Sequence, residues 1–135
     1  MPDEVRFLDL DQVMEIHQSQ LDLHGGSAGL RDEGLLRSAL AQPEASFGGQ
    51  WLHATIWKMA AAYLFHLVAN HPFVDGNKRV GAVAAVVFLR MNGQAMEAAE
   101  DAYADLVLAV AAGTASRDDV ATFLRTHARP LSADG

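Results

Sequence analysis

Apolar residues recur every three to four positions over most of the chain, which is the pattern of amphipathic helices. Glycines, prolines and N-capping residues flank these stretches and indicate where helices begin and end. Together these signals predict an all-α domain of about six helices. The helices are expected at residues 10–23, 32–40, 51–70, 77–91, 102–112 and 116–127.

The stretch at 51–70 is apolar nearly all round, as expected for a helix that other elements surround. A second central helix is predicted at 77–91. Its valines also suit a strand, but its alanines and its unbroken length favour a helix. Residues 43–50 contain a proline and two adjacent glycines, and they are expected to form a loop or a small hairpin flap. Residues 130–135 are expected to be a tail.

Composition is that of one soluble globular domain. The chain has 135 residues, half of them apolar and a fifth charged, and we expect a single domain over residues 1–135. The formal net charge of −7 argues against direct binding of nucleic acid or of an anionic membrane surface. Because the chain has no cysteine, disulfides, thiolate metal sites and a cysteine nucleophile are excluded. No secretory leader and no span of about 20 apolar residues is recognisable, so a cytoplasmic location is expected.

The residues that could carry chemistry gather between the two central helices, in the sequence HPFVDGNKR at 71–79. Pro72 disfavours helical geometry at His71, so the first central helix is expected to end there. Gly76 can take a positive φ and lets the backbone approach a ligand closely. The second central helix is then expected to begin at about Asn77.

Two cations, Lys78 and Arg79, stand in the first turn of that helix, where unpaired N–H groups and the positive end of the helix dipole disfavour them. Phosphate bound on these N–H groups would make the arrangement favourable. Asp75 can either neutralise the cations or hold Mg²⁺ that also contacts phosphate oxygens, and His71 is a candidate general base. An ordinary polar turn contains similar residues, so the residues alone leave both interpretations open.

These nine residues resemble the signature of the Fic/Doc family, His-x-Phe-x-Asp/Glu-Gly/Ala-Asn-Gly/Lys-Arg, at all seven specified positions. Similarity to the Doc (death-on-curing) branch extends over about residues 5–128, which we take as the core of the domain. It includes the stretches 30–36, 43–49, 58–61, 88–93 and 104–106. The resemblance implies an all-α toxin that transfers part of ATP onto a hydroxyl side chain of a cytosolic protein.

The resemblance also implies a role for each matching residue. His71 would take the proton of the target hydroxyl, and Asp75 would act in catalysis by binding Mg²⁺. Phe73 would hold the loop on the core, and the flap at 46–51 would pair with the target as an added strand. ATP would be bound by Gly76, Asn77, Lys78 and Arg79.

Two departures from adenylyltransferases of the family bear on the reaction. Lys78 stands where they have glycine, and Ala82 stands where they have a second arginine that clamps phosphate. The Doc branch shares this pattern and is associated with a reversed nucleotide. We therefore expect a Doc-type kinase acting on Ser or Thr, and the resemblance points to a translation elongation factor as the target. AMP transfer is the alternative activity, and a non-catalytic binding module is the third possibility.

Inhibition by a separate chain is also expected. Many Fic proteins carry an inhibitory motif, [Ser/Thr]-x-x-x-Glu-[Gly/Asn]. The nearest match, Glu33-Gly34, has Gly29 in place of Ser or Thr, so a cognate antitoxin in a type II toxin–antitoxin pair is the expected inhibitor. Among other polar residues, His66 is expected to be a hydrogen-bonded core histidine and His53 an exposed loop histidine.

Overall fold

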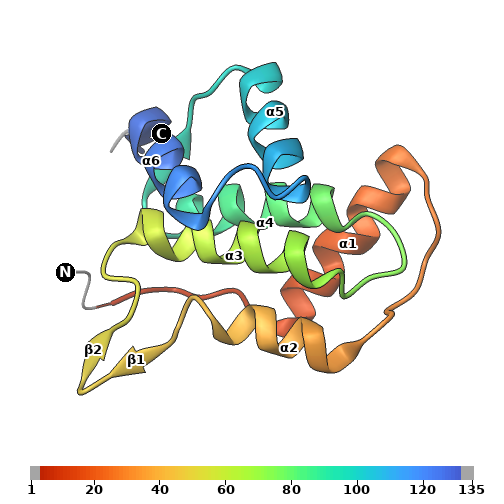
Figure 1. Cartoon of the computed structure of the whole chain (residues 1–135), viewed down its shortest axis with the longest axis horizontal. Coiled ribbons are helices and arrows are strands. Elements are labelled where there is room, and N and C mark those ends of the chain that lie inside the picture. Colours follow the sequence, from red (N-terminus) through yellow and green to blue (C-terminus); the bar gives the residue numbers. More distant parts are fainter. Residues whose placement is uncertain (1–3, 132–135) are drawn as a thin grey trace.

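The computed structural model describes residues 4–131 of the protein. Within this range the helices are α1 (Leu10–His24), α2 (Glu33–Ala41), α3 (Ile56–Asn70), α4 (Asn77–Met91), α5 (Glu100–Ala111) and α6 (Arg117–His127). The strands are β1 (Ser46–Phe47), β2 (Gln50–Trp51), β3 (Gln94–Met96) and β4 (Ala128–Pro130). The predicted all-α class with about six helices is confirmed (Figure 1).

Helices α3 and α4 lie side by side at the centre, with α1 and α2 on one side and α5 and α6 on the other (Figure 1). Gly81 allows their close approach, because a Cβ atom there would lie 2.9 Å from Val68 Cγ2 and 3.1 Å from the Leu64 carbonyl oxygen. Both of these α3 residues are fully buried, and each contributes about 1.5–3 kcal/mol to folding. This tight pair fixes the ends of the loop that joins it.

Helix α3 begins at Ile56 and not at residue 51 as predicted. The Thr55 side chain accepts a hydrogen bond from the Lys58 N–H and caps the helix. Trp51 instead belongs to strand β2 of the flap, where it lies opposite Ser46 in an antiparallel pair. The hairpin interpretation of the flap is therefore correct, and apolar character alone extended the predicted helix too far.

A second small sheet joins β3 to β4, and the sequence did not predict it. Gln94 pairs with Pro130 and Met96 with Ala128 in antiparallel register. Pro130 is thus part of a strand and not of a tail, because it pairs with a segment more than 30 positions away. Residues 132–135 of the predicted tail lie outside the described residues. No helix in residues 4–131 combines the length and apolar character needed to cross a bilayer.

Candidate active site

His71 ends helix α3 in a left-handed conformation, with φ 49° and ψ 54°. Within residues 4–131 it is the one non-glycine residue with positive φ, a conformation that costs free energy. Arg31 holds it in place, since its Nε donates to the His71 carbonyl oxygen at 2.7 Å and its Nη2 donates to the Asn70 carbonyl oxygen at 2.9 Å. The chain between α1 and α2 thereby positions the candidate base.

Asn77 braces the loop from within. Its Oδ1 accepts a hydrogen bond from the Phe73 N–H, and its Nδ2 donates to the Phe73 carbonyl oxygen, both at 2.9 Å. Only 7% of Asn77 is exposed, so both polar groups of Phe73 depend on this side chain. The loop geometry therefore rests on a residue that the sequence had assigned only to the anion cradle.

His17 supports the loop from helix α1, a role that the sequence analysis missed. Its ring stacks on the buried Phe73 ring with centroids 3.9 Å apart and planes 10° apart. Its Nε2 lies 2.9 Å from the Asp75 carbonyl oxygen. The signal was present, because His17 stands on the apolar face of α1 together with the buried Val13, but its partners lie in a distant segment.

The start of helix α4 carries positive charge that no acidic residue in its first turn compensates. Gly76 caps it at φ 85° without a side-chain hydrogen bond, and the first turn has no acidic residue. Every other described helix has a side-chain cap, an acidic residue in its first turn, or both. Its first N–H groups have no acceptor within residues 4–131. Lys78 and Arg79 are exposed and form no ion pair with any described residue.

The structure brings all the predicted site residues to one cavity. This cavity has a volume of about 410 Å³ and is lined by His71, Val74, Asp75, Gly76, Asn77, Lys78 and Arg79. A negatively charged group in it would meet N–H groups and two cations on one side and the His71 ring on another. The arrangement suits phosphate.

Asp75 is ionised and well positioned beside the cradle. Its carboxylate accepts hydrogen bonds from the Ser27 N–H at 3.2 Å and the Gly76 N–H at 2.8 Å. These bonds, followed by the charge of Arg79, lower the pKa of Asp75 below its usual value. Gly26 makes room for the carboxylate, since a Cβ atom there would lie 2.7 Å from Oδ2.

No cluster of three or more potential metal ligands occurs in the described part of the chain. Asp75 would therefore hold a cation only together with phosphate oxygens and water. This is the usual coordination of Mg²⁺ in nucleotide sites, so the donor set fits that ion.

The His71 ring is exposed and can reach a substrate. Its Nδ1 lies 3.4 Å from Asn77 Nδ2, beyond the usual range of a hydrogen bond. Its Nε2 has no hydrogen-bond partner among the described residues. Asn77 Nδ2 can only donate and therefore does not hold a proton on Nδ1. Nε2 accepts the proton of a hydroxyl group in the tautomer that carries the ring proton on Nδ1.

Two further cavities share residues with the loop. One of them has a volume of about 490 Å³ and shares Lys78 and Arg79 with the 410 Å³ cavity. The rest of its lining is largely apolar and includes Ala82, Met96, Tyr103 and Val107. The other, of about 610 Å³, shares His71 and extends to Ser116 at the start of α6. The cations therefore face one neighbouring cavity and the candidate base faces the other.

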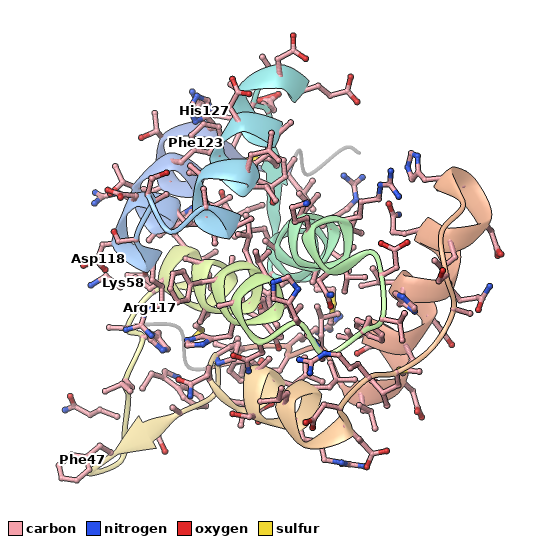
Figure 2. All side chains as sticks on the ribbon, turned by 45° about the vertical axis from the view of Figure 1, so that its right-hand side comes forward. Phe47, Lys58, Arg117, Asp118, Phe123 and His127 are labelled. Atoms are coloured by element: carbon pink, nitrogen blue, oxygen red, sulfur yellow. The ribbon has the colours of Figure 1, made fainter. Side chains whose placement is uncertain are left out.

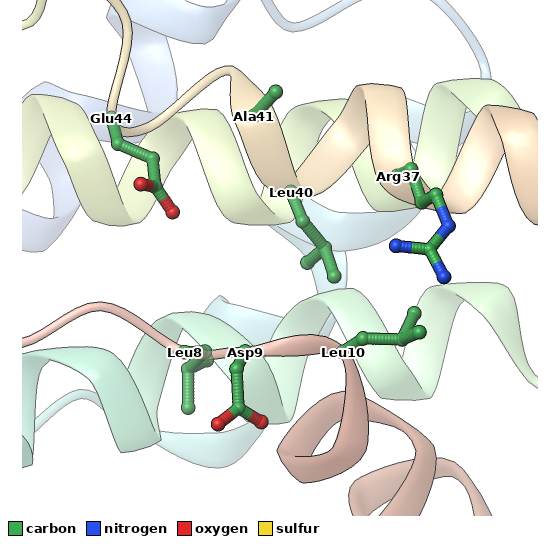
Figure 3. A pocket seen from close by; sticks show the side chains of 7 residues that line it. All are labelled: Leu8, Asp9, Leu10, Arg37, Leu40, Ala41 and Glu44. Atoms are coloured by element: carbon green, nitrogen blue, oxygen red, sulfur yellow. The ribbon is translucent and has the colours of Figure 1, made fainter.

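Another groove lies away from this loop, between the chain that precedes α1 and helix α2 (Figure 3). It has a volume of about 440 Å³, and Leu8, Leu10 and Leu40 are among its lining residues. It shares no residue with the three cavities around the loop. We assign it no role in the chemistry of the site.

The remaining histidines differ in how well the sequence predicted them. His66 makes the predicted hydrogen bond, with its Nε2 3.2 Å from Arg117 Nη1, but it is only partly buried and is not a core residue. Burial, followed by the charge of Arg117, lowers the pKa of His66 to about 4. The prediction for His53 is wrong, because only 6% of this residue is exposed. Arg117 and Asp118 in the first turn of α6 line the same cavity as His53, a proximity of distant segments that no local pattern could indicate.

Comparison with known proteins agrees with this site. Residues 7–89 match the model of the Fic/DOC family, which is more than half of the chain, and the protein belongs to this family. It is 40% identical to Toxin Doc of Mycolicibacterium smegmatis over 102 residues, which cover 74% of this chain and 78% of that protein. It is 29% identical to Protein kinase doc of Escherichia phage P1 over 122 residues, covering 90% and 94%. The expected Doc branch is confirmed.

Proposed function

We propose that the protein is an ATP-dependent phosphotransferase that modifies a Ser or Thr hydroxyl of a cytosolic protein. One observation carries the proposal: the anion cradle at the start of α4 lies between an exposed histidine and an apolar cavity. The phosphates of ATP fit the cradle, and the apolar cavity fits a nucleoside. The name of the relative from phage P1, a protein kinase, supports the same reaction.

The order of the cavities supports transfer of the γ-phosphoryl group. With the nucleoside in the cavity beside Lys78 and Arg79, the terminal phosphate lies nearest to His71. The hydroxyl oxygen forms a bond to the γ-phosphorus, and the bond from this phosphorus to the bridging oxygen breaks. The hydroxyl proton passes to His71 Nε2, and ADP leaves. Mg²⁺ at Asp75 would neutralise charge on the phosphate oxygens.

AMP transfer is the second candidate, since the same loop can hold the nucleotide in the opposite direction. The reaction is tested with the purified protein, Mg²⁺, and ATP labelled at the α- or the γ-phosphate, on a panel of translation factors that includes elongation factors. We expect label from the γ-position only and a mass increase of one phosphate. A mass increase of one AMP, with α-label, would establish the second candidate, and no modification of any target would favour a non-catalytic binding module.

A double substitution tests which residues set the orientation of the nucleotide. Lys78→Gly with Ala82→Arg restores the glycine and the phosphate-clamping arginine of the adenylyltransferases. We expect the ratio of AMP to phosphate product to rise about tenfold or more, because hydrogen bonds to charged groups contribute about 1.5–3 kcal/mol each. Intact-mass analysis of the target measures this ratio, with the two single variants as controls. An unchanged ratio would place the determinant elsewhere.

A substitution at Asp75 tests the metal. Asp75→Asn keeps the size of the side chain but removes the charge that a hard cation requires. We expect the Mg²⁺ concentration for half-maximal activity to rise at least about tenfold, with partial recovery at high Mg²⁺. Asp105→Asn, which changes an exposed carboxylate on α5, serves as the matched control. If Asp75→Asn has the Mg²⁺ dependence of the wild type, Asp75 is not a metal ligand.

We further infer that the protein is a toxin restrained by a separate antitoxin. The name of the M. smegmatis relative supports this role. The sequence has no inhibitory motif of the Fic type, and Ala82 replaces the arginine that such a motif addresses. The test is growth of cells that express this chain alone or with the small open reading frame beside its gene. Harmless expression of the active chain alone would contradict the inference.

A further inference from the structure

A small cationic cavity lies at the base of the flap, apart from the active site. Its volume is about 240 Å³, and its lining is Leu52, His53, Lys58, Arg117, Asp118 and Ala121. It shares no residue with the cavities that surround the loop 71–79. Lys58, Arg117 and Asp118 cluster on one side of the molecule, with Phe47 at the far end of the flap (Figure 2).

The two cations of this cavity lack an acidic partner. Neither Lys58 nor Arg117 has a carboxylate within ion-pair distance among the described residues, although Asp118 lines the same cavity. Arg117 Nη1 contacts Nε2 of His66, a ring that is neutral at pH 7 because its pKa is lowered to about 4. The cavity therefore has a formal charge of +1 on a chain whose net charge is −7.

Helix α6 begins at this cavity, and its first turn also carries the carboxylates of Asp118 and Asp119. Ser116 Oγ accepts a hydrogen bond from the Asp119 N–H and so caps the helix. The N–H groups of Arg117 and Asp118 have no acceptor within residues 4–131. Such groups at a helix start attract negative charge.

His53 supplies an independent indication of a missing ligand. It is more than nine-tenths buried, yet its Nε2 makes no hydrogen bond within the described chain. A buried polar nitrogen without a partner costs free energy, and such atoms are rare in folded proteins. His53 lines the cavity, so a rotation of its ring would bring this nitrogen to an oxygen acceptor bound there.

We propose that this cavity binds a carboxylate side chain of the protein substrate and thereby selects acidic targets. The inference rests on the proposed function, because it requires that the substrate be a protein. A singly charged carboxylate would neutralise the formal charge of +1, and it is the anion that Asp and Glu side chains of an unmodified protein supply. Leu52, which lines the cavity and is 63% exposed, offers the partner an apolar contact, and Phe47, which is 86% exposed, offers another at the far end of the flap.

The position of the cavity is compatible with a single partner that also reaches the base. Lys58 and His71 are separated by 13 positions along α3 and its C-terminal cap, or about 20 Å. The start of α6 joins the two cavities, since Ser116 lines the cavity that contains His71 and the next residue, Arg117, lines the cationic cavity. The acidic residue would thus lie about 20 Å from the modified hydroxyl, a span of roughly six residues in extended chain.

The cavity itself is tested by NMR titration with N-acetylglutamate amide, with N-acetylglutamine amide and inorganic phosphate as comparison probes at constant ionic strength. We expect the glutamate probe to shift the backbone amide signals of Arg117 and Asp118 and the ring signals of His53. Lys58→Gln should abolish these shifts. A response to phosphate and none to the glutamate probe, or no response to either, would overturn the proposal.

Kinetics on the identified target tests the selection of substrates. We expect Lys58→Gln to raise KM for the protein target about tenfold and to change kcat by less than twofold. Arg117→Lys should retain most of the affinity, whereas Arg117→Gln should not. Arg125→Gln, at the opposite end of α6 and exposed, is the matched control and should resemble the wild type.

The two proposals fail in different ways. If no protein is modified, the proposed function fails and the NMR titration still decides whether the cavity binds a carboxylate. If a target is modified with an unchanged KM in Lys58→Gln, the proposed function stands and the cavity does not select the substrate.

Discussion

Replacing His71 by alanine is expected to reduce phosphoryl transfer by about 10²–10⁴-fold, the usual cost of losing a general base. The ring is exposed and Nε2 has no hydrogen-bond partner in the described chain, so the fold does not depend on it. His71→Asn is the better variant for the comparison, because asparagine tolerates the left-handed conformation at this position. Single-turnover transfer measures the effect, and thermal unfolding shows whether the fold is retained.

The two His71 variants should be equally inactive, with an unfolding midpoint close to that of the wild type. ATP binding should change little, because the cradle is made by other residues. Full activity in either variant would remove His71 from the mechanism. Lost activity accompanied by a large fall in the unfolding midpoint would assign His71 a structural role.

Replacing Asn77 by alanine is expected to affect both stability and activity. The substitution leaves the N–H and the carbonyl group of Phe73 buried without partners. One such group costs about 1–3 kcal/mol, so a loss of at least this size in the free energy of unfolding is expected. The loop that carries His71 and the cradle would loosen, and phosphoryl transfer should fall in parallel. Urea unfolding and the transfer rate are the measurements.

Asn77→Asp separates the two effects. Aspartate can still accept the Phe73 N–H, but its second oxygen would face the Phe73 carbonyl oxygen instead of donating to it, so the variant should be less stable than the wild type. Its negative charge would repel phosphate at the start of α4, so ATP binding should fall below that of the alanine variant. If Asn77→Asp binds ATP as well as the wild type does, phosphate does not occupy this helix start.

Interactions between neighbours in the chain were predictable from the sequence. The Ser116 capping box forms as predicted, with Asp119 donating its N–H to the serine and accepting the N–H of Ser116 in return. The loop 71–79 ends α3 and starts α4 at the expected residues because Pro72 and Gly76 act on adjacent backbone. The same local chemistry indicated that the α4 start would attract an anion.

Predictions failed where the partners lie far apart in sequence. The pairing of β3 with β4 and the burial of His53 both depend on contacts that hydrophobic periodicity does not specify. The stacking of His17 on Phe73 joins α1 to the loop across 56 positions. None of these contacts has a signal within a window of a single helix.

The sequence by itself determined the helices, the turn between the central pair and the types of residue that could hold phosphate, because each of these depends on backbone preferences and local charge. The tertiary structure alone decided that Arg31 and Asn77 hold the loop in shape, and that the cradle lies between an apolar cavity and His71. It also decided that Lys58 and Arg117 share a cavity. Each of these features joins segments that lie far apart in the sequence. They form only when the helices pack together, so no short stretch of sequence can indicate them.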